Sequence, residues 1–291
     1  MKYTIQNKFL SVTVSDRGAE LQSLRRTSDG TEYLWQGDAA CWDERAPVLF
    51  PICGRLTEGR YTYGGKSYEM GLHGFVRGTC FSLEEQTDTS LTLVFTQQEA
   101  FAASYPFSYT FRVRYELTGS TLRQSFLITN TGDGTLPFSY GAHPGFRVPL
   151  HEGEAFSDYH IAFGAGIVPQ QVEISPTGFP TGASTPFALT DGVFALSHEA
   201  FDGAGIFLTD MGDTVTLTSR KHGGGVRLCY TGMTHLGFWK PDHTDAPFVC
   251  IEPWHGLPSR MGVVDDFATK AYMCQLPAGA SHEAHIDITV L

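Results

Sequence analysis

The feature that most constrains the fold of this chain is a period-two alternation of apolar and polar residues. Leu10, Val12 and Val14 alternate with serine and threonine, and between residues 111 and 117 aromatic and aliphatic residues alternate with arginine and glutamate. Such a run presents one apolar and one polar face, which is typical of a half-buried β-strand. Similar runs, separated by clusters of Gly, Asp, Asn and Ser, recur at residues 91–96, 122–129, 215–219, 226–230 and 285–291.

Helical periodicity is nearly absent, and its few candidates, such as residues 99–104, span one or two turns. Many strands without alternating helices indicate an all-β antiparallel sandwich rather than a parallel α/β sheet. A chain of 291 residues with 42% hydrophobic content can bury a large core. Because no repeat of fixed period and no linker rich in Pro, Gly or Ser divides it, we expect a single domain spanning residues 1–291.

Charge and cysteine usage argue against several classes of partner. The 20 basic and 31 acidic residues give a formal net charge of -11, spread without blocks, which argues against nucleic acid and anionic membranes as partners. The six cysteines form no C-x-x-C pair and are expected to be reduced thiols. Because the sequence shows neither an apolar signal segment nor a long apolar span, we expect a cytoplasmic protein, either a monomer or a homodimer.

One glutamate stands out in the segment 248–256, Phe-Val-Cys-Ile-Glu-Pro-Trp-His-Gly, where an apolar run ends in Glu252. Pro253 biases the backbone of Glu252 towards an extended conformation, and Trp254 supplies a broad apolar face. Glu252 is therefore a candidate reactive acid or base. Considered alone, it is more typical of a carboxylate that accepts backbone N–H groups at the end of a strand.

Two histidines and one arginine occupy comparable glycine-rich segments. His73 lies in Leu-His-Gly-Phe-Val-Arg (72–77), His143 lies in Gly-Ala-His-Pro-Gly-Phe (141–146), and Arg55 follows a glycine after an apolar run. Irregular backbone beside aromatic residues suits a pocket wall, although an isolated histidine is more often structural. An arginine there is suited to bind a hydroxyl or a phosphate, whereas a lone arginine more commonly forms a surface ion pair.

In this order, Gly54-Arg55 and the segments 73–77, 141–146 and 251–256 resemble the aldose 1-epimerase (galactose mutarotase-like) family, most closely its LacX-like branch. The resemblance extends from about the first strand to the last, and several motifs in a fixed order are far more specific than any one of them. It implies a single-domain β-supersandwich with a sugar cleft on one concave sheet. It also implies the interconversion of α and β anomers of a hexose without a metal or a cofactor.

The resemblance implies a catalytic role for three residues. His143 would be the general acid for the ring oxygen, Glu252 the general base for the anomeric hydroxyl, and His73 a partner that holds the ring oxygen. Opening a hemiacetal ring requires a proton to leave O1 while another reaches the ring oxygen, so an imidazolium and a carboxylate suffice. We expect His143 to be protonated near neutral pH if a negative field surrounds it.

The sugar-binding candidates are Arg55, Arg77, Trp239 and Lys240. Arg55 would bind sugar hydroxyls, and the segment 238–241, which contains Trp239 and Lys240, is similar to the family's stretch before the glutamate. Trp239 or Trp254 could stack on the apolar face of a sugar, although core packing is the commoner role of a tryptophan in a sandwich.

Several alternatives remain open at this stage. Arg55 and Arg77 could meet a phosphate, which would make the chain a hexose-6-phosphate 1-epimerase. The segment 201–205, Phe-Asp-Gly-Ala-Gly, departs from a stretch whose second aspartate grips the sugar in many relatives, which leaves a non-catalytic carbohydrate-binding or regulatory module possible. A glycosidase with paired carboxylates is also compatible with a β-sandwich, but no second acid is placed as distinctively as Glu252.

Overall fold

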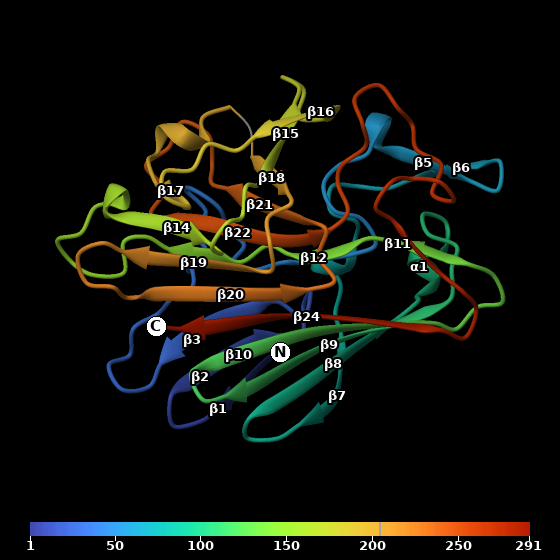
Figure 1. The fold of residues 1–291 in the computed structure, drawn as a ribbon. Coiled ribbons are helices and arrows are strands. Elements are labelled where there is room, and N and C mark those ends of the chain that lie inside the picture. Colours follow the sequence, from blue (N-terminus) through green and yellow to red (C-terminus); the bar gives the residue numbers. More distant parts are fainter. Residues whose placement is uncertain (204) are drawn as a thin grey trace.

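The computed structural model describes residues 1–203 and 205–291 and arranges them in antiparallel β-sheets (Figure 1). A nine-stranded sheet contains, in spatial order, β17 (Val193–Ala195), β14 (Tyr159–Phe163), β19 (Thr214–Ser219), β20 (Gly225–Thr231), β24 (Ser281–Val290), β10 (Thr121–Asn130), β9 (Tyr109–Thr118), β8 (Ser90–Thr96) and β7 (Ser82–Gln86). An eight-stranded sheet contains β16 (Pro180–Pro186), β15 (Gln170–Ile174), β18 (Ile206–Thr209), β21 (His235–Trp239), β22 (Phe248–His255), β12 (Tyr140–Ala142) and β4 (Val48–Leu49), with β13 (Gly145–Arg147) also paired to β22. All the strand runs expected from the sequence are confirmed.

Smaller elements complete the fold. A three-stranded sheet is formed by β1 (Lys2–Gln6), β2 (Leu10–Ser15) and β3 (Leu21–Arg26), and two-stranded sheets by β5 (Arg60–Tyr63) with β6 (Lys66–Glu69) and by β11 (Leu136–Phe138) with β23 (Cys274–Leu276). The expected short helix is α1 (Glu99–Ala102), and single 3₁₀ turns span Thr57–Gly59, Val76–Gly78, Phe156–Asp158 and Glu199–Phe201. Within the described ranges, no helix has the length and hydropathy required to cross a bilayer.

Strands β9 and β10 show how the alternation builds the core. Phe111, Val113 and Tyr115 on β9 are fully buried, whereas the residues between them are partly exposed. Phe126 on β10 lies opposite Val113 in the antiparallel register, so the apolar faces of the two strands coincide. The same hydrophobic cluster continues through the two large sheets and includes residues from Ile5 to Val290.

Strand β22 is buried on both faces, and this property positions the site. Val249 and Ile251 belong to the central core cluster. Cys250 and Trp254 belong to two smaller clusters on the opposite face of the sheet. Because side chains alternate along a strand, Glu252 lies on the same face as Cys250 and Trp254. That face of the eight-stranded sheet is therefore covered by aromatic and polar residues instead of the main core.

A buried histidine on β21 gives the protein a testable pH dependence. His235 is fully buried, and burial lowers its pKa to about 3. The unfolded chain therefore binds one more proton than the folded chain between about pH 6.5 and 3. The contribution of the neutral His235 to the free energy of unfolding is complete above pH 6.5 and decreases as the pH falls.

For the His235→Gln variant we expect urea unfolding between pH 7 and 4 to show a shallower fall in unfolding free energy than for the wild type. The slope should differ by up to about 1.4 kcal/mol per pH unit, the value for one proton. Identical slopes for the two proteins would contradict the assignment of a neutral buried imidazole to His235.

Candidate active site

Glu252 lies in the middle of β22 and is only 1% exposed. Its neighbour across the sheet is Gly237 on β21. A Cβ atom added to Gly237 would lie 3.2 Å from the Cβ of Glu252 and 3.4 Å from its Oε2. The absence of a side chain on β21 thus leaves the space in which the carboxyl group is held.

His143 follows β12 and brings an imidazole to this carboxyl group. Its backbone N–H donates to the Pro47 carbonyl at 3.0 Å, and the Ile251 N–H donates to the Pro144 carbonyl at 3.1 Å, so the turn is attached to the strands on both sides. The Nε2 atom of His143 lies 3.2 Å from Oε1 of Glu252. Among the described residues, neither Glu252 Oε1 nor His143 Nδ1 has a hydrogen-bond partner. Because buried polar atoms are rarely left unpaired, these two are available to a ligand.

His73 is fixed by reciprocal hydrogen bonds with Gly54. The Gly54 N–H donates to His73 Nδ1 at 3.0 Å, and the His73 N–H donates to the Gly54 carbonyl at 2.8 Å. Since Nδ1 accepts, the proton of the neutral ring is on Nε2, which is therefore a donor. His73 also has a φ of 61°, a conformation that is uncommon outside glycine and that recurs at functional sites.

Gly74, with a φ of +74°, lies where the segment that carries His73 packs closely against the backbone of Phe50. A Cβ there would lie 2.2 Å from the Phe50 carbonyl oxygen, so the backbone that carries His73 would have to move. The matched control is Gly64 in the β5–β6 turn, which also has a positive φ (+57°) but has no atom within 4 Å of an added Cβ.

We expect Gly64→Ala to cost about 1–2 kcal/mol, the backbone strain alone. Gly74→Ala should cost an additional 1–3 kcal/mol or so, because overpacking adds to the strain. Urea unfolding of the two variants measures the difference, and equal losses of unfolding free energy would show that the contact with Phe50 is not a constraint.

Burial determines the protonation states of the three site residues. It raises the pKa of Glu252 well above its usual value and lowers the pKa of His143 to about 3. The pKa of His73 is well below its usual value, because of burial first and the neighbouring His143 second. The expectation of an imidazolium held by a negative field is therefore not met without a ligand. Desolvation opposes charge separation, and the pair shares one proton as a carboxylic acid and a neutral imidazole.

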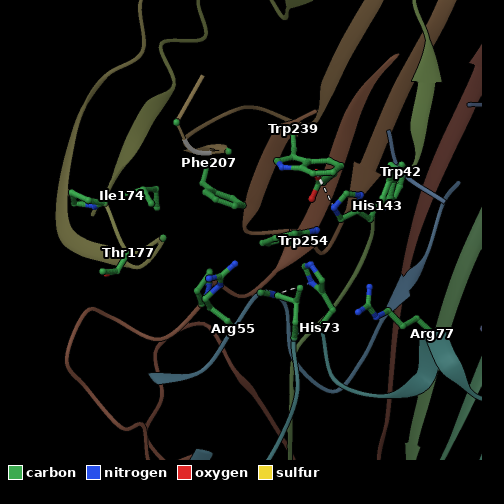
Figure 2. Close-up of a pocket in the computed structure, with 18 residues that line it drawn as sticks. Trp42, Arg55, His73, Arg77, His143, Ile174, Thr177, Phe207, Trp239 and Trp254 are labelled. Carbon is green, nitrogen blue, oxygen red and sulfur yellow. Dashed lines mark hydrogen bonds and ion pairs between the residues drawn. The ribbon is translucent and has the colours of Figure 1, made fainter. Parts of the chain in front are cut away.

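A cavity of about 520 Å³ brings these three residues together, since His73, His143 and Glu252 all line it. The ring centroids of the two histidines are 5.6 Å apart, with the rings nearly perpendicular. Figure 2 shows both rings directed into the same hollow. The carboxyl group of Glu252 lies beside His143. A volume of this size is typical of small-molecule pockets.

Aromatic side chains form much of the cavity wall (Figure 2). The ring centroids of Trp42 and Trp239 lie 5.1 and 5.5 Å from that of His143. Trp254 and Phe207 continue the wall, with ring centroids 5.1 Å apart. Flat apolar rings beside hydrogen-bonding groups suit a ligand that has one apolar face and a polar rim.

The cationic candidates differ in their positions. Arg55 is exposed and lines the cavity, and within residues 1–203 and 205–291 it has no ion-pair partner. Arg77 also lines the cavity, but its Nη1 contacts both carboxylate oxygens of Glu44, at 2.9 and 3.2 Å.

Lys240 is not brought to the cavity. It is 1% exposed, and its ammonium donates to the Thr244 carbonyl at 2.6 Å and the Pro241 carbonyl at 3.2 Å. Because it directly follows Trp239, which faces the cavity, it points to the other side of the chain. We therefore do not retain Lys240 as a candidate sugar-binding residue.

Other cavity residues carry no recognisable motif and are not predicted from the sequence. Trp42 lies in a polar loop, and Phe207 lies in a short strand whose cavity-facing side becomes visible only when the sheet is known. Ile174 at the end of β15 and residues 176–178 in the turn that follows add a further part of the wall. In the altered segment 201–205, Gly203 and Gly205 line the cavity, whereas Ala204 lies outside the described residues.

Comparisons with known proteins agree with this architecture. Residues 1–266 match the family described as aldose 1-epimerase. The chromosomal protein LacX of Lactococcus lactis subsp. lactis is 34% identical over 307 residues, which cover 100% of both chains. The structure of a galactose mutarotase related enzyme from Lactobacillus acidophilus is 33% identical, with a TM-score of 0.96 over 100% of this chain and 97% of that one. A galactose mutarotase-like protein from Lactobacillus casei is 32% identical, with a TM-score of 0.95 over 100% of both chains. With matches to a family and to relatives over this much of its length, the chain belongs to the aldose 1-epimerase family.

Proposed function

We propose that the protein is a mutarotase that interconverts the α and β anomers of an unphosphorylated aldohexose. The observation that carries this proposal is the 3.2 Å contact between His143 Nε2 and Glu252 Oε1 at the wall of an open cavity. One proton donor and one proton acceptor are the groups that hemiacetal opening requires. Aromatic rings around the pair suit the apolar face of a pyranose.

Ring opening proceeds by three proton transfers, one within the pair and two with the sugar. The proton shared by the pair first moves to His143, which leaves Glu252 as a carboxylate. Glu252 then takes the proton of the O1 hydroxyl, the bond between C1 and the ring oxygen breaks, and His143 gives its proton to that oxygen. The pair ends as a carboxylic acid and a neutral imidazole, the state that burial favours. Rotation about C1–C2 and the reverse steps close the ring as either anomer.

His73 holds the ring oxygen during these steps. Its Nδ1 accepts from Gly54, so its Nε2–H is available as a donor to the sugar. Burial keeps the pKa of His73 well below its usual value, so that the ring donates its hydrogen bond as a neutral group. The steps comprise proton transfers, cleavage of the bond between C1 and the ring oxygen, and a bond rotation, and none of them is an oxidation or a reduction.

A hexose 6-phosphate is the second candidate substrate, and Arg55 favours it. Its guanidinium lies at the exposed side of the cavity, whereas Arg77 is held by Glu44. A free arginine is well suited to bind a phosphate. The proton transfers at C1 would be the same for both substrates.

We place the reaction in the cytoplasm. All six cysteines are free thiols, including the exposed Cys80. Thiols that remain reduced are typical of that compartment, so the substrate would be a sugar inside the cell.

Saturation-transfer NMR between the anomeric protons of galactose, glucose and glucose 6-phosphate tests the proposal. We expect the protein to accelerate exchange of galactose or glucose more than exchange of glucose 6-phosphate. Acceleration of glucose 6-phosphate alone would favour the phosphorylated substrate. Sugar binding by calorimetry without acceleration of any exchange would contradict both and indicate a non-catalytic binding module.

A further inference from the structure

We propose that Cys250, His143 and Glu252 form a binding site for Zn²⁺ at the wall of the sugar cavity, where the metal and the sugar compete. A sulfur, an imidazole nitrogen and a carboxylate oxygen from these three residues all lie within 4.8 Å of one another. This goes beyond mutarotation but involves the acid–base pair of the proposed function. Bound Zn²⁺ would therefore act as a reversible inhibitor.

The alternation of β22 brings the thiol to this position. Cys250 precedes Glu252 by two residues, so both side chains lie on the cavity side of the sheet. Zinc binds sulfur at about 2.3 Å and nitrogen or oxygen at about 2.0–2.2 Å, so ligand atoms of one ion cannot be more than about 4.5 Å apart. The 3.2 Å between His143 Nε2 and Glu252 Oε1 meets this requirement already, and the Cys250 sulfur, within 4.8 Å of a nitrogen and an oxygen of the pair, lies close to the limit.

An unpaired polar atom gives a second, independent observation. Glu252 is 1% exposed, yet its Oε1 has no hydrogen-bond partner among the described residues. A buried polar atom without a partner costs free energy, which a coordinated ion would recover. His143 and Glu252 line the cavity, whereas Cys250 is fully buried beside them, so an ion can enter only from the cavity.

The chemistry of the three ligands selects the ion. Zinc sites with three protein ligands from Cys, His and a carboxylate keep a fourth position for water or substrate. Mg²⁺ and Ca²⁺ prefer oxygen ligands only and should bind poorly to a set that contains a thiolate. The fourth position of this site opens to the cavity, where a water molecule or a sugar hydroxyl can occupy it.

Charge and proton balance follow from the ionised form in which the ligands bind. Zn²⁺ is bound by cysteine as a thiolate and by glutamate as a carboxylate, so any protons on these two groups leave for solvent when the metal binds. The dication and the two anions then form a neutral buried site, and the affinity should rise with pH.

Calorimetric titration with Zn²⁺ and absorption spectra with Co²⁺ test the site directly. We expect the wild type to bind one ion per chain, with a near-ultraviolet thiolate-to-Co²⁺ band. Cys250→Ser and Cys250→Ala should lose that band. Loss of a residue that only supports a metal ligand weakens binding by roughly 10- to 100-fold, and loss of the ligand Cys250 should weaken Zn²⁺ binding by more than that. Circular dichroism of each variant verifies folding.

Two controls separate this site from adventitious binding. Cys80→Ser removes the exposed thiol, and His243→Ala disrupts an exposed cluster with Asp202 and Asp242 that could also hold a cation. Both should retain the affinity and the spectrum of the wild type. Tight Zn²⁺ binding by the Cys250 variants, or loss of binding in either control, would overturn the proposal.

Inhibition links the metal site to the reaction. Zn²⁺ should slow anomer exchange of the wild type competitively with sugar, while Cys250→Ser keeps the exchange rate of the free enzyme and resists the metal. If the wild type accelerates no exchange yet binds Zn²⁺ through Cys250, the proposed function fails and the metal site stands. If exchange is fast and Zn²⁺ neither binds nor inhibits, the metal site fails alone.

Discussion

Replacement of Glu252 by glutamine is expected to lower the rate of anomer exchange by roughly a hundred- to ten-thousandfold, the usual contribution of a positioned acid or base. Glutamine has the same shape as glutamate but cannot accept the O1 proton. The carboxyl group has no substitute, because no other Asp or Glu is among the described residues that line the cavity. Saturation-transfer NMR at matched protein concentration measures the loss.

The stability of the same variant provides the control. Because burial raises the pKa of Glu252, the unfolded chain gives up this proton at lower pH than the folded chain does. Stability is therefore lost as the pH rises from the usual glutamate value towards the folded pKa. The Glu252→Gln variant should lack this loss and be at least as stable as the wild type at pH 8 in urea. If the variant is destabilised, its inactivity could result from unfolding and would not identify Glu252 as the base. If the variant is stable and active, Glu252 is not the base.

Replacement of His143 by asparagine is expected to reduce exchange by a similar factor, because the ring oxygen would lose its proton donor. The amide can still donate a hydrogen bond, but it cannot transfer a proton. Since His143 and Glu252 pass one proton between them, the double variant should be little worse than either single variant. Additive losses in the double variant would contradict a shared proton.

A matched control for His143→Asn is His255→Asn. His255 stacks on Tyr140 with ring centroids 5.3 Å apart, its Nδ1–H donates to the Gly232 carbonyl at 2.8 Å, and it does not line the cavity that the described residues form. The His255→Asn substitution should leave the rate of anomer exchange within a few-fold of the wild-type rate. A large loss in this variant would show that the effect of the His143 substitution is not specific to the acid.

Much of the fold could be predicted because alternation is a local signal. A strand such as β9 shows in its own residues which face is buried, and turn residues such as those at 63–66 mark where β5 ends and β6 begins. Strand β22 is different, because both of its faces are buried and its sequence does not distinguish the core side from the cavity side. Only the arrangement of the sheets makes that distinction.

Only the site residues that lie in family motifs could be predicted from the sequence. His73, His143 and Glu252 carry family motifs, and the structure brings all three to one cavity. Trp42 and Phe207 lie in segments without a motif, so their place in the wall depends on long-range packing. The protonation states could not be predicted from the sequence, because the desolvation that lowers the pKa of His143 comes from residues distant in the chain. Local pattern therefore predicted which residues line the cavity at the candidate site but not their environment.

The most direct test of the central claim is a crystal structure of the Glu252→Gln variant with a bound aldohexose. The expected complex has the O1 hydroxyl within about 2.6–3.2 Å of residue 252 and the ring oxygen within the same distance of His143 or His73. The pyranose should lie against the tryptophans of the cavity wall. A sugar bound elsewhere on the protein, or one whose anomeric carbon faces away from these three residues, would contradict the account.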